Sequence, residues 1–212
     1  RKPGKLSWSQ GTVKGIAANR RVLEKGKWVG FGVNPNGPTD PSLPVLKVTD
    51  ESGAIRAVLM GFACHCTTLG GSFNKICAEW AGYACDAVEA AHPGATAMVV
   101  IGCGADANPE PRRNLEDAKA HGAAIALEAN RLVSGPMSPL GGAIRARIKR
   151  IELPLSNIPT KAELERRIHR PAAEGYFARI LLDQLGRGQP LPSSVPYVIQ
   201  TWCFGDSLAM VF

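Results

Sequence analysis

The sequence lacks the features that mark several classes of protein. Its 212 residues contain no apolar run near the roughly 20 residues that a membrane-spanning helix needs. No C-x-x-C pair is present, which argues against a structural zinc ribbon. A G-x-S-x-G elbow and a phosphate-loop lysine are also missing. Aromatic residues are scarce at 6%, and the net charge of +7 is spread over several segments, so a nucleic-acid surface is not expected.

What is present is the composition of a globular protein. Hydrophobic residues make up 45% and charged residues 20%, in a chain long enough to bury a core. Most of the cysteines lie in apolar segments, so we expect buried free thiols for most of them, with one or two disulfides left open. They are Cys64, Cys66, Cys77, Cys85, Cys103 and Cys203.

The apolar pattern predicts an α/β fold with a central mixed, partly parallel β-sheet flanked by helices. Residues 45–50 and 55–64 are typical of a hairpin whose second strand is apolar on both faces and therefore central. A helix over 78–92 and a second buried strand over 96–102 follow, and this order favours a parallel pair. Residues 30–44 are expected to form a long irregular loop, because Pro and Gly punctuate them.

The second half of the chain is predicted to add a helix over 113–134, a basic strand over 143–153 with one solvated face, and a hairpin of buried strands over 198–204 and 207–212. A further helix should begin at Thr160, which forms a capping box with Glu163, and Pro171 should interrupt it. Because the sequence stops within an apolar strand, we expect residues 1–212 to be part of one domain, truncated at both ends.

Two polar segments are predicted to meet at one edge of the sheet. His65 directly follows the apolar segment 55–64, at the edge where open α/β sheets bind ligands. A neutral imidazole offers one free nitrogen to such a ligand. Asp106 and Asn108 follow the next strand and lie at the same edge if the two strands are parallel. Taken singly, these residues also suit a core histidine and a helix N-cap. Their convergence favours a functional site.

Other residues are open to two interpretations. Asn19 and Arg20 suit recognition of an anionic or carbonyl group, or a solvated polar segment. Thr67 places a hydroxyl near His65. Glu79 begins the helix over 78–92, where a carboxylate favours the helix dipole.

The motifs, taken in order, resemble the neutral/alkaline non-lysosomal ceramidase family. The matching segments span nearly the whole chain and are ANRR (18–21), NP (34–35), DPSLPVLKVTDESG (40–53), FACHCTTLGG (62–71), AEWAGYA (78–84), VVIGCGADANPEPR (99–112) and FGDSLAMVF (204–212). In that family, FACHCTTLGG corresponds to the strand that ends in a zinc-binding histidine, and GCGADANPEP to the loop that carries the catalytic serine. This chain has Cys66 where the family usually has Gly, and no serine in that loop.

The resemblance implies a zinc-dependent amidohydrolase that hydrolyses an N-acyl amide bond, as family members do with ceramide. It implies one Zn²⁺, with His65 as a ligand and a second His, a Glu and a Tyr outside this chain, so that the segment alone should bind metal poorly and be inactive. Asp106 or Asn108 would position water or substrate. The implied partner is a small lipid amide, with transient membrane-surface contact and no nucleic acid. Family members are commonly exported, and nothing else indicates a compartment.

The same resemblance implies that Asn19, Arg20 and Thr67 contact the substrate. Three alternatives remain at this point. The missing loop serine is compatible with a non-catalytic binding module on the same scaffold, or with a metal hydrolase for a different amide. A cysteine hydrolase using Cys66 or Cys103 is the third, although neighbouring side chains on a strand point to opposite faces, which separates Cys66 from His65.

Overall fold

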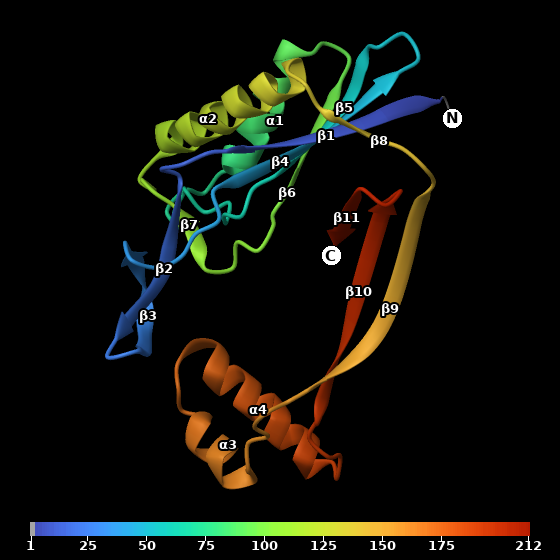
Figure 1. Ribbon diagram of the computed structural model, residues 1–212. Helices are drawn as coiled ribbons and strands as arrows, with labels where there is room; N and C mark the ends of the chain where they lie inside the picture. Colours follow the sequence, from blue (N-terminus) through green and yellow to red (C-terminus); the bar gives the residue numbers. More distant parts are fainter. Residues whose placement is uncertain (1–2) are drawn as a thin grey trace. The chain divides into compact units, whose positions relative to one another are not determined.

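The computed structural model describes residues 3–212, which form two compact units divided after Gly141 (Figure 1). The first unit holds a five-stranded sheet in the order β6-β5-β4-β1-β8. Only β5 and β6 are parallel, and the other neighbours are antiparallel, which confirms the predicted mixed sheet. The strands are β1 (Gly4–Thr12), β4 (Ser42–Asp50), β5 (Ile55–Gly61), β6 (Thr96–Val100) and β8 (Ser138–Leu140).

The structure confirms the predicted position of β5 within the sheet but not that of β6. β5 lies between β4 and β6, so it is an interior strand as expected. β6 is an edge strand, and of its residues only Ala97 is buried, while Met98 is exposed. The prediction of a second buried strand was therefore wrong. An apolar run shows that a strand can be buried, but it does not show which strand receives a neighbour on both sides.

Two helices, α1 (Glu79–Ala91) and α2 (Leu115–Ser134), pack against each other and cover one face of this sheet (Figure 1). Both were predicted from helical spacing of apolar residues. The core between helices and sheet includes the fully buried Val58, Met60, Trp80, Val88 and Ile125. Gly122 allows the close approach of the helices, because a Cβ there would lie 2.8 Å from the Trp80 carbonyl oxygen.

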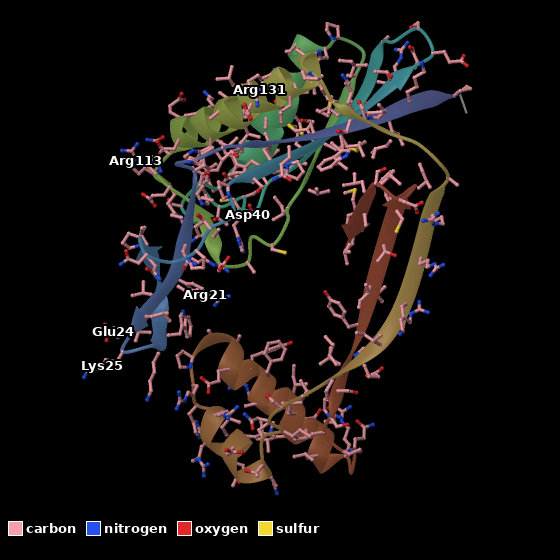
Figure 2. All side chains as sticks on the ribbon, in the orientation of Figure 1. Arg21, Glu24, Lys25, Asp40, Arg113 and Arg131 are labelled. Atoms are coloured by element: carbon pink, nitrogen blue, oxygen red, sulfur yellow. The ribbon has the colours of Figure 1, made fainter. Side chains whose placement is uncertain are left out.

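A second, three-stranded sheet of the first unit was not predicted. It has the antiparallel order β3-β2-β7 and consists of β2 (Ala17–Glu24), β3 (Lys27–Asn34) and β7 (Ala107–Pro109). The loop predicted over 30–44 therefore covers only residues 35–41. Most side chains of β3 are exposed, so this hairpin lacks the buried alternation by which strands are recognised. Figure 2 shows Glu24 and Lys25 at its free end.

The second unit contains a three-stranded antiparallel sheet, β11-β10-β9, and two helices. Its elements are β9 (Ile144–Pro154), α3 (Lys161–Arg167), α4 (Ala172–Gly186), β10 (Ser194–Phe204) and β11 (Leu208–Val211). The capping box of Thr160 and Glu163 is present, and Pro171 separates the two helices, both as predicted. No helix of residues 3–212 is long and apolar enough to cross a membrane.

Two burial predictions in this unit were wrong. β9 is exposed on both faces rather than one. The predicted hairpin of β10 and β11 is present, but Val211 and Phe212 are exposed rather than buried. Alternation along a strand indicates which residues share a face, and burial requires in addition a layer packed against that face.

Candidate active site

The short strand β7 brings together the segments that the sequence singled out. It pairs with β2 so that Ala107 lies opposite Asn19, and the Arg20 amide donates to the Asp106 carbonyl at 2.7 Å. On its other side, the His65 amide donates to the Ala107 carbonyl at 3.0 Å. The predicted convergence of the His65 and Asp106 segments is therefore present. β2 joins them through a pairing that the sequence did not indicate.

The imidazole of His65 is held by backbone carbonyl groups. Its Nδ1 lies 2.7 Å from the Gly104 oxygen and 3.1 Å from the Ala107 oxygen. Both carbonyl oxygens can only accept, so Nδ1 carries a proton, and in the neutral imidazole the lone pair is on Nε2. This fixed tautomer is the one that metal-binding histidines show when a carbonyl group orients the ring. His65 lies in the loop four residues after β5, rather than at the end of the strand itself.

Gly104 is a position where a small change should disturb this geometry. A Cβ on Gly104 would lie 2.6 Å from the Cys64 nitrogen and 2.9 Å from the Ala63 carbonyl carbon, both backbone atoms. We predict that Gly104→Ala shifts the loop away from His65 and lowers the free energy of unfolding by about 1–3 kcal/mol. Denaturant titration measures this change. Gly102→Ala is the matched control, because its Cβ would make only an ordinary 3.8 Å contact. Equal stability of the two variants would contradict the prediction.

Thr67, Asn108 and Arg20 form a polar network next to His65. The side-chain oxygen of Asn108 accepts hydrogen bonds from the Thr67 hydroxyl at 3.3 Å and from Arg20 Nη1 at 3.4 Å. These two donors fix the orientation of the Asn108 amide. Within residues 3–212, its Nδ2 group donates no hydrogen bond, so it is available to a ligand. Arg20 is held further by the Ala105 carbonyl at 3.1 Å and by the ring of Phe31, 4.6 Å from the guanidinium carbon.

Asn19 is the most deeply buried of the predicted site residues. Its Nδ2 donates to the Pro38 carbonyl at 2.9 Å and to Asp106 Oδ2 at 3.3 Å, and its Oδ1 accepts from the Arg21 amide. Both ends of the side chain are therefore engaged within the chain. In this arrangement Asn19 positions Asp106, and substrate contact by Asn19 stays a prediction.

Glu79 and Trp80 support the segment that carries His65. The buried Glu79 carboxylate accepts from the Thr68 amide at 3.1 Å and from the Leu69 amide at 2.7 Å, and its backbone has a left-handed φ of 58°. Such strained backbone persists where surrounding contacts hold it. Trp80 Nε1 donates to the His65 carbonyl at 2.9 Å. The predicted role of Glu79 at the helix dipole is thus only part of its function, since it also holds the loop.

The cysteines around His65 are poorly suited to nucleophilic catalysis. Burial raises the pKa of the Cys64 thiol to about 12 and also raises the pKa of Cys66. A thiol with a raised pKa stays protonated at neutral pH, and the thiolate is the nucleophile. This weakens the cysteine-hydrolase alternative at Cys66.

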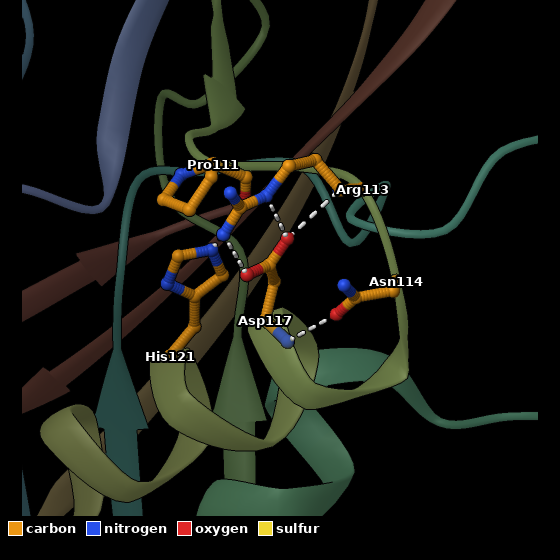
Figure 3. Close-up of polar contacts among 5 residues, drawn as sticks. All are labelled: Pro111, Arg113, Asn114, Asp117 and His121. Atoms are coloured by element: carbon orange, nitrogen blue, oxygen red, sulfur yellow. Dashed lines mark hydrogen bonds and ion pairs between the residues drawn. The ribbon is translucent and has the colours of Figure 1, made fainter.

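Polar contacts at the start of α2 hold the segment that follows β7 (Figure 3). Asn114 caps the helix by accepting from the Asp117 amide at 3.0 Å. The Arg113 guanidinium contacts both oxygens of Asp117 at 2.8 and 3.0 Å. His121 Nε2 donates to the Pro111 carbonyl at 2.7 Å. The Arg113 hydrogen bonds lower the pKa of Asp117 from 3.8 to about 2.

This pair predicts a pH dependence of stability. A carboxylate whose pKa is lowered by folding stabilises the protein above its ordinary pKa, and that contribution is lost as the pH falls through the folded value. As the pH falls from 4 to 2, we expect the free energy of unfolding of the Asp117→Asn variant to decrease less steeply than that of the unmodified protein. Denaturation monitored across this range measures the slope. Asp86→Asn, an exposed carboxylate on α1, is the control, and equal slopes for all three proteins would contradict the assignment.

A comparison with solved structures found chains with a similar fold. A neutral ceramidase from Pseudomonas aeruginosa superimposes with a TM-score of 0.66 at 15% sequence identity, over 96% of this chain and 39% of that one. A ceramidase described as complexed with C2 gives a TM-score of 0.68 at 14% identity, over 96% of this chain and 40% of that one. The chain has a ceramidase-like fold. No family model and no curated protein sequence matches it. The chain spans about two fifths of each ceramidase structure.

The ceramidase-like fold confirms the resemblance seen in the sequence at the level of structure. The roles of the individual site residues remain predictions. Within residues 3–212, no three His, Cys, Asp or Glu side chains gather as a metal centre would require. His65 lies next to the predicted site residues, and its Nδ1 contacts leave Nε2 for a ligand. Phe31 was not predicted to belong to this site, because residues 30–44 were expected to form a loop.

Proposed function

We propose that this chain contributes to the active site of a zinc-dependent hydrolase that cleaves an N-acyl amide bond, with ceramide as one candidate substrate. The observation that carries the proposal is the oriented imidazole of His65, whose Nδ1 is bound by two carbonyl groups and whose Nε2 has no hydrogen-bond partner among residues 3–212. The fold is in agreement, because the solved structures that share it are described as ceramidases. The other metal ligands would come from outside residues 1–212.

The residues around His65 suit the binding of an amide carbonyl group. A bound Zn²⁺ would polarise that carbonyl and lower the pKa of a bound water toward about 7. Asn108 would donate from its free Nδ2 group to the substrate carbonyl oxygen, in the orientation that Thr67 and Arg20 impose. Asp106, held by Asn19, would accept a proton or a hydrogen bond from water. Asn108 and Asp106 are in this way proposed to take the place of the missing loop serine.

The experiment that tests the proposal uses the whole natural polypeptide that contains this chain. Hydrolysis of a short-chain ceramide and of a simple fatty-acid amide is measured before and after removal of metal with a chelator. We expect turnover of at least one of these amides, its loss on chelation, and its recovery when Zn²⁺ is added. Turnover that persists in protein shown to be free of metal would overturn the zinc proposal. Tight binding of both amides without any turnover would favour the non-catalytic alternative.

A further inference from the structure

The hairpin of β2 and β3 carries an exposed cluster of large apolar side chains. Each of them is more than half exposed, and they come from both strands of the hairpin: Leu23, Trp28, Val29, Phe31 and Val33. Single exposed apolar residues are common on proteins, but a contiguous group of this kind usually marks an interaction site. Trp28 and Phe31 pack edge to face with ring centroids 5.5 Å apart, so the two largest side chains of the cluster lie together.

Basic residues lie on the same hairpin as this cluster. Arg21, Lys25 and Lys27 carry positive charge, against the single carboxylate of Glu24. Arg21 lies along the hairpin, and Glu24 and Lys25 lie at its free end (Figure 2). None of the ion pairs among residues 3–212 involves any of these four side chains. The hairpin therefore presents an excess of unpaired positive charge together with aromatic and aliphatic surface.

Side-chain contacts link the aromatic pair of the hairpin to the candidate active site. Trp28 contacts Phe31, and Phe31 lies 4.6 Å from the guanidinium carbon of Arg20. Arg20 in turn donates to Asn108 at 3.4 Å. Phe31 and Val33 also line a cavity of about 150 Å³ that Asn108 borders. A chain of contacts thus joins the exposed end of the hairpin to a small cavity beside Asn108.

We propose that the β2–β3 hairpin docks on the surface of an anionic lipid bilayer, with Trp28 and Phe31 at the interface and Lys25 and Lys27 against the headgroups. Trp is enriched at the level of lipid headgroups, and basic residues are attracted to anionic membranes. A protein partner fits less well, because the cores of protein interfaces are depleted of Lys. The apolar face then leads a lipid chain toward the cavity beside Asn108. This last step rests on the proposed function, while bilayer binding does not.

The test is co-sedimentation of the whole natural polypeptide with vesicles of phosphatidylcholine, with and without phosphatidylserine. We expect binding only where phosphatidylserine is present, weakening as salt rises. K25E/K27E should bind about 20-fold or more weakly, because each basic residue near an anionic surface contributes about fivefold in affinity and reversal removes at least that much. W28S/F31S should bind about tenfold or more weakly through lost apolar contact.

Matched controls come from the second unit. R147E/K149E makes the same charge change on the exposed strand β9. Y176S/F177S removes an equally exposed aromatic pair, whose rings lie 5.4 Å apart on α4. Both controls should bind vesicles as the unmodified protein does. Equal losses in controls and hairpin variants would overturn the proposal. The proposal would also be overturned if the unmodified protein did not bind the vesicles. That result would indicate that another part of the polypeptide or a protein partner covers the hairpin.

Two further measurements separate this proposal from the proposed function. His65→Ala should bind vesicles normally, whatever its effect on hydrolysis. K25E/K27E should hydrolyse a water-soluble short-chain amide at the unmodified rate but hydrolyse an amide embedded in vesicles about 20-fold more slowly. Equal rates of the variant and the unmodified protein on the embedded amide would overturn the delivery step.

Discussion

Replacing His65 by alanine is expected to lower kcat/KM for amide hydrolysis by about a thousandfold or more and to remove most of the bound zinc. A metal ion stabilises the charge on a polarised carbonyl by several kcal/mol, and about 4 kcal/mol of lost transition-state stabilisation corresponds to a thousandfold in rate. The Nδ1 contacts orient the ring so that Nε2 is the nitrogen left to bind a metal, and alanine offers no ligand atom in its place. Steady-state kinetics and metal analysis on the whole natural polypeptide measure both effects.

His169→Ala is the matched control for this substitution. His169 is exposed in the turn between α3 and α4, so its loss removes an imidazole without touching the loops around His65. This variant should keep its zinc and its rate. If His65→Ala retained full zinc content and more than a tenth of the rate, His65 would be an ordinary loop histidine and the proposed mechanism would be wrong.

Replacing Trp80 by alanine should lower the free energy of unfolding by about 3–5 kcal/mol, the cost of removing a large aromatic side chain from a packed core. Trp80 is fully buried and packs edge to face on Phe62, with centroids 5.6 Å apart. Its Nε1 group also satisfies the His65 carbonyl. A cavity at this point would loosen α1, β5 and the loop that they hold. Denaturant titration monitored by circular dichroism measures the change.

Trp80→Phe separates packing from hydrogen bonding at this position. Phenylalanine keeps an aromatic ring against Phe62 but cannot donate to the His65 carbonyl. We expect it to cost about 1–3 kcal/mol, the range for a buried acceptor that loses its partner. The account of Trp80 would fail if the alanine variant were no less stable than the phenylalanine variant.

The parts of the fold that were predictable share a strong local pattern. β5, α1 and β6 carry long apolar runs or helical spacing, and their order along the chain favours a parallel pair of strands. That reasoning was sufficient to predict that His65 and Asp106 lie at one edge of the sheet. The capping box at Thr160 was predictable for a similar reason, because both partners lie within one turn of helix.

The rest of the site depends on contacts between distant segments, which leave little trace in a local pattern. β7 has only three residues, so no periodicity could indicate that it places Asn108 beside Arg20. The β2–β3 hairpin exposes most of its side chains and was mistaken in part for a loop. Glu79 was expected to interact with its own helix, whereas its carboxylate also binds amides ten and eleven residues earlier.

The central claim is that Nε2 of His65 is a zinc ligand. The most direct test is a crystal structure of the whole natural polypeptide grown with Zn²⁺, with the metal located by its anomalous scattering. The account predicts a zinc ion about 2.0–2.1 Å from Nε2 of His65, with Nδ1 still bound to the Gly104 and Ala107 carbonyl groups. Zinc bound at a site that excludes His65, or bound through Nδ1 after rotation of the ring, would contradict it.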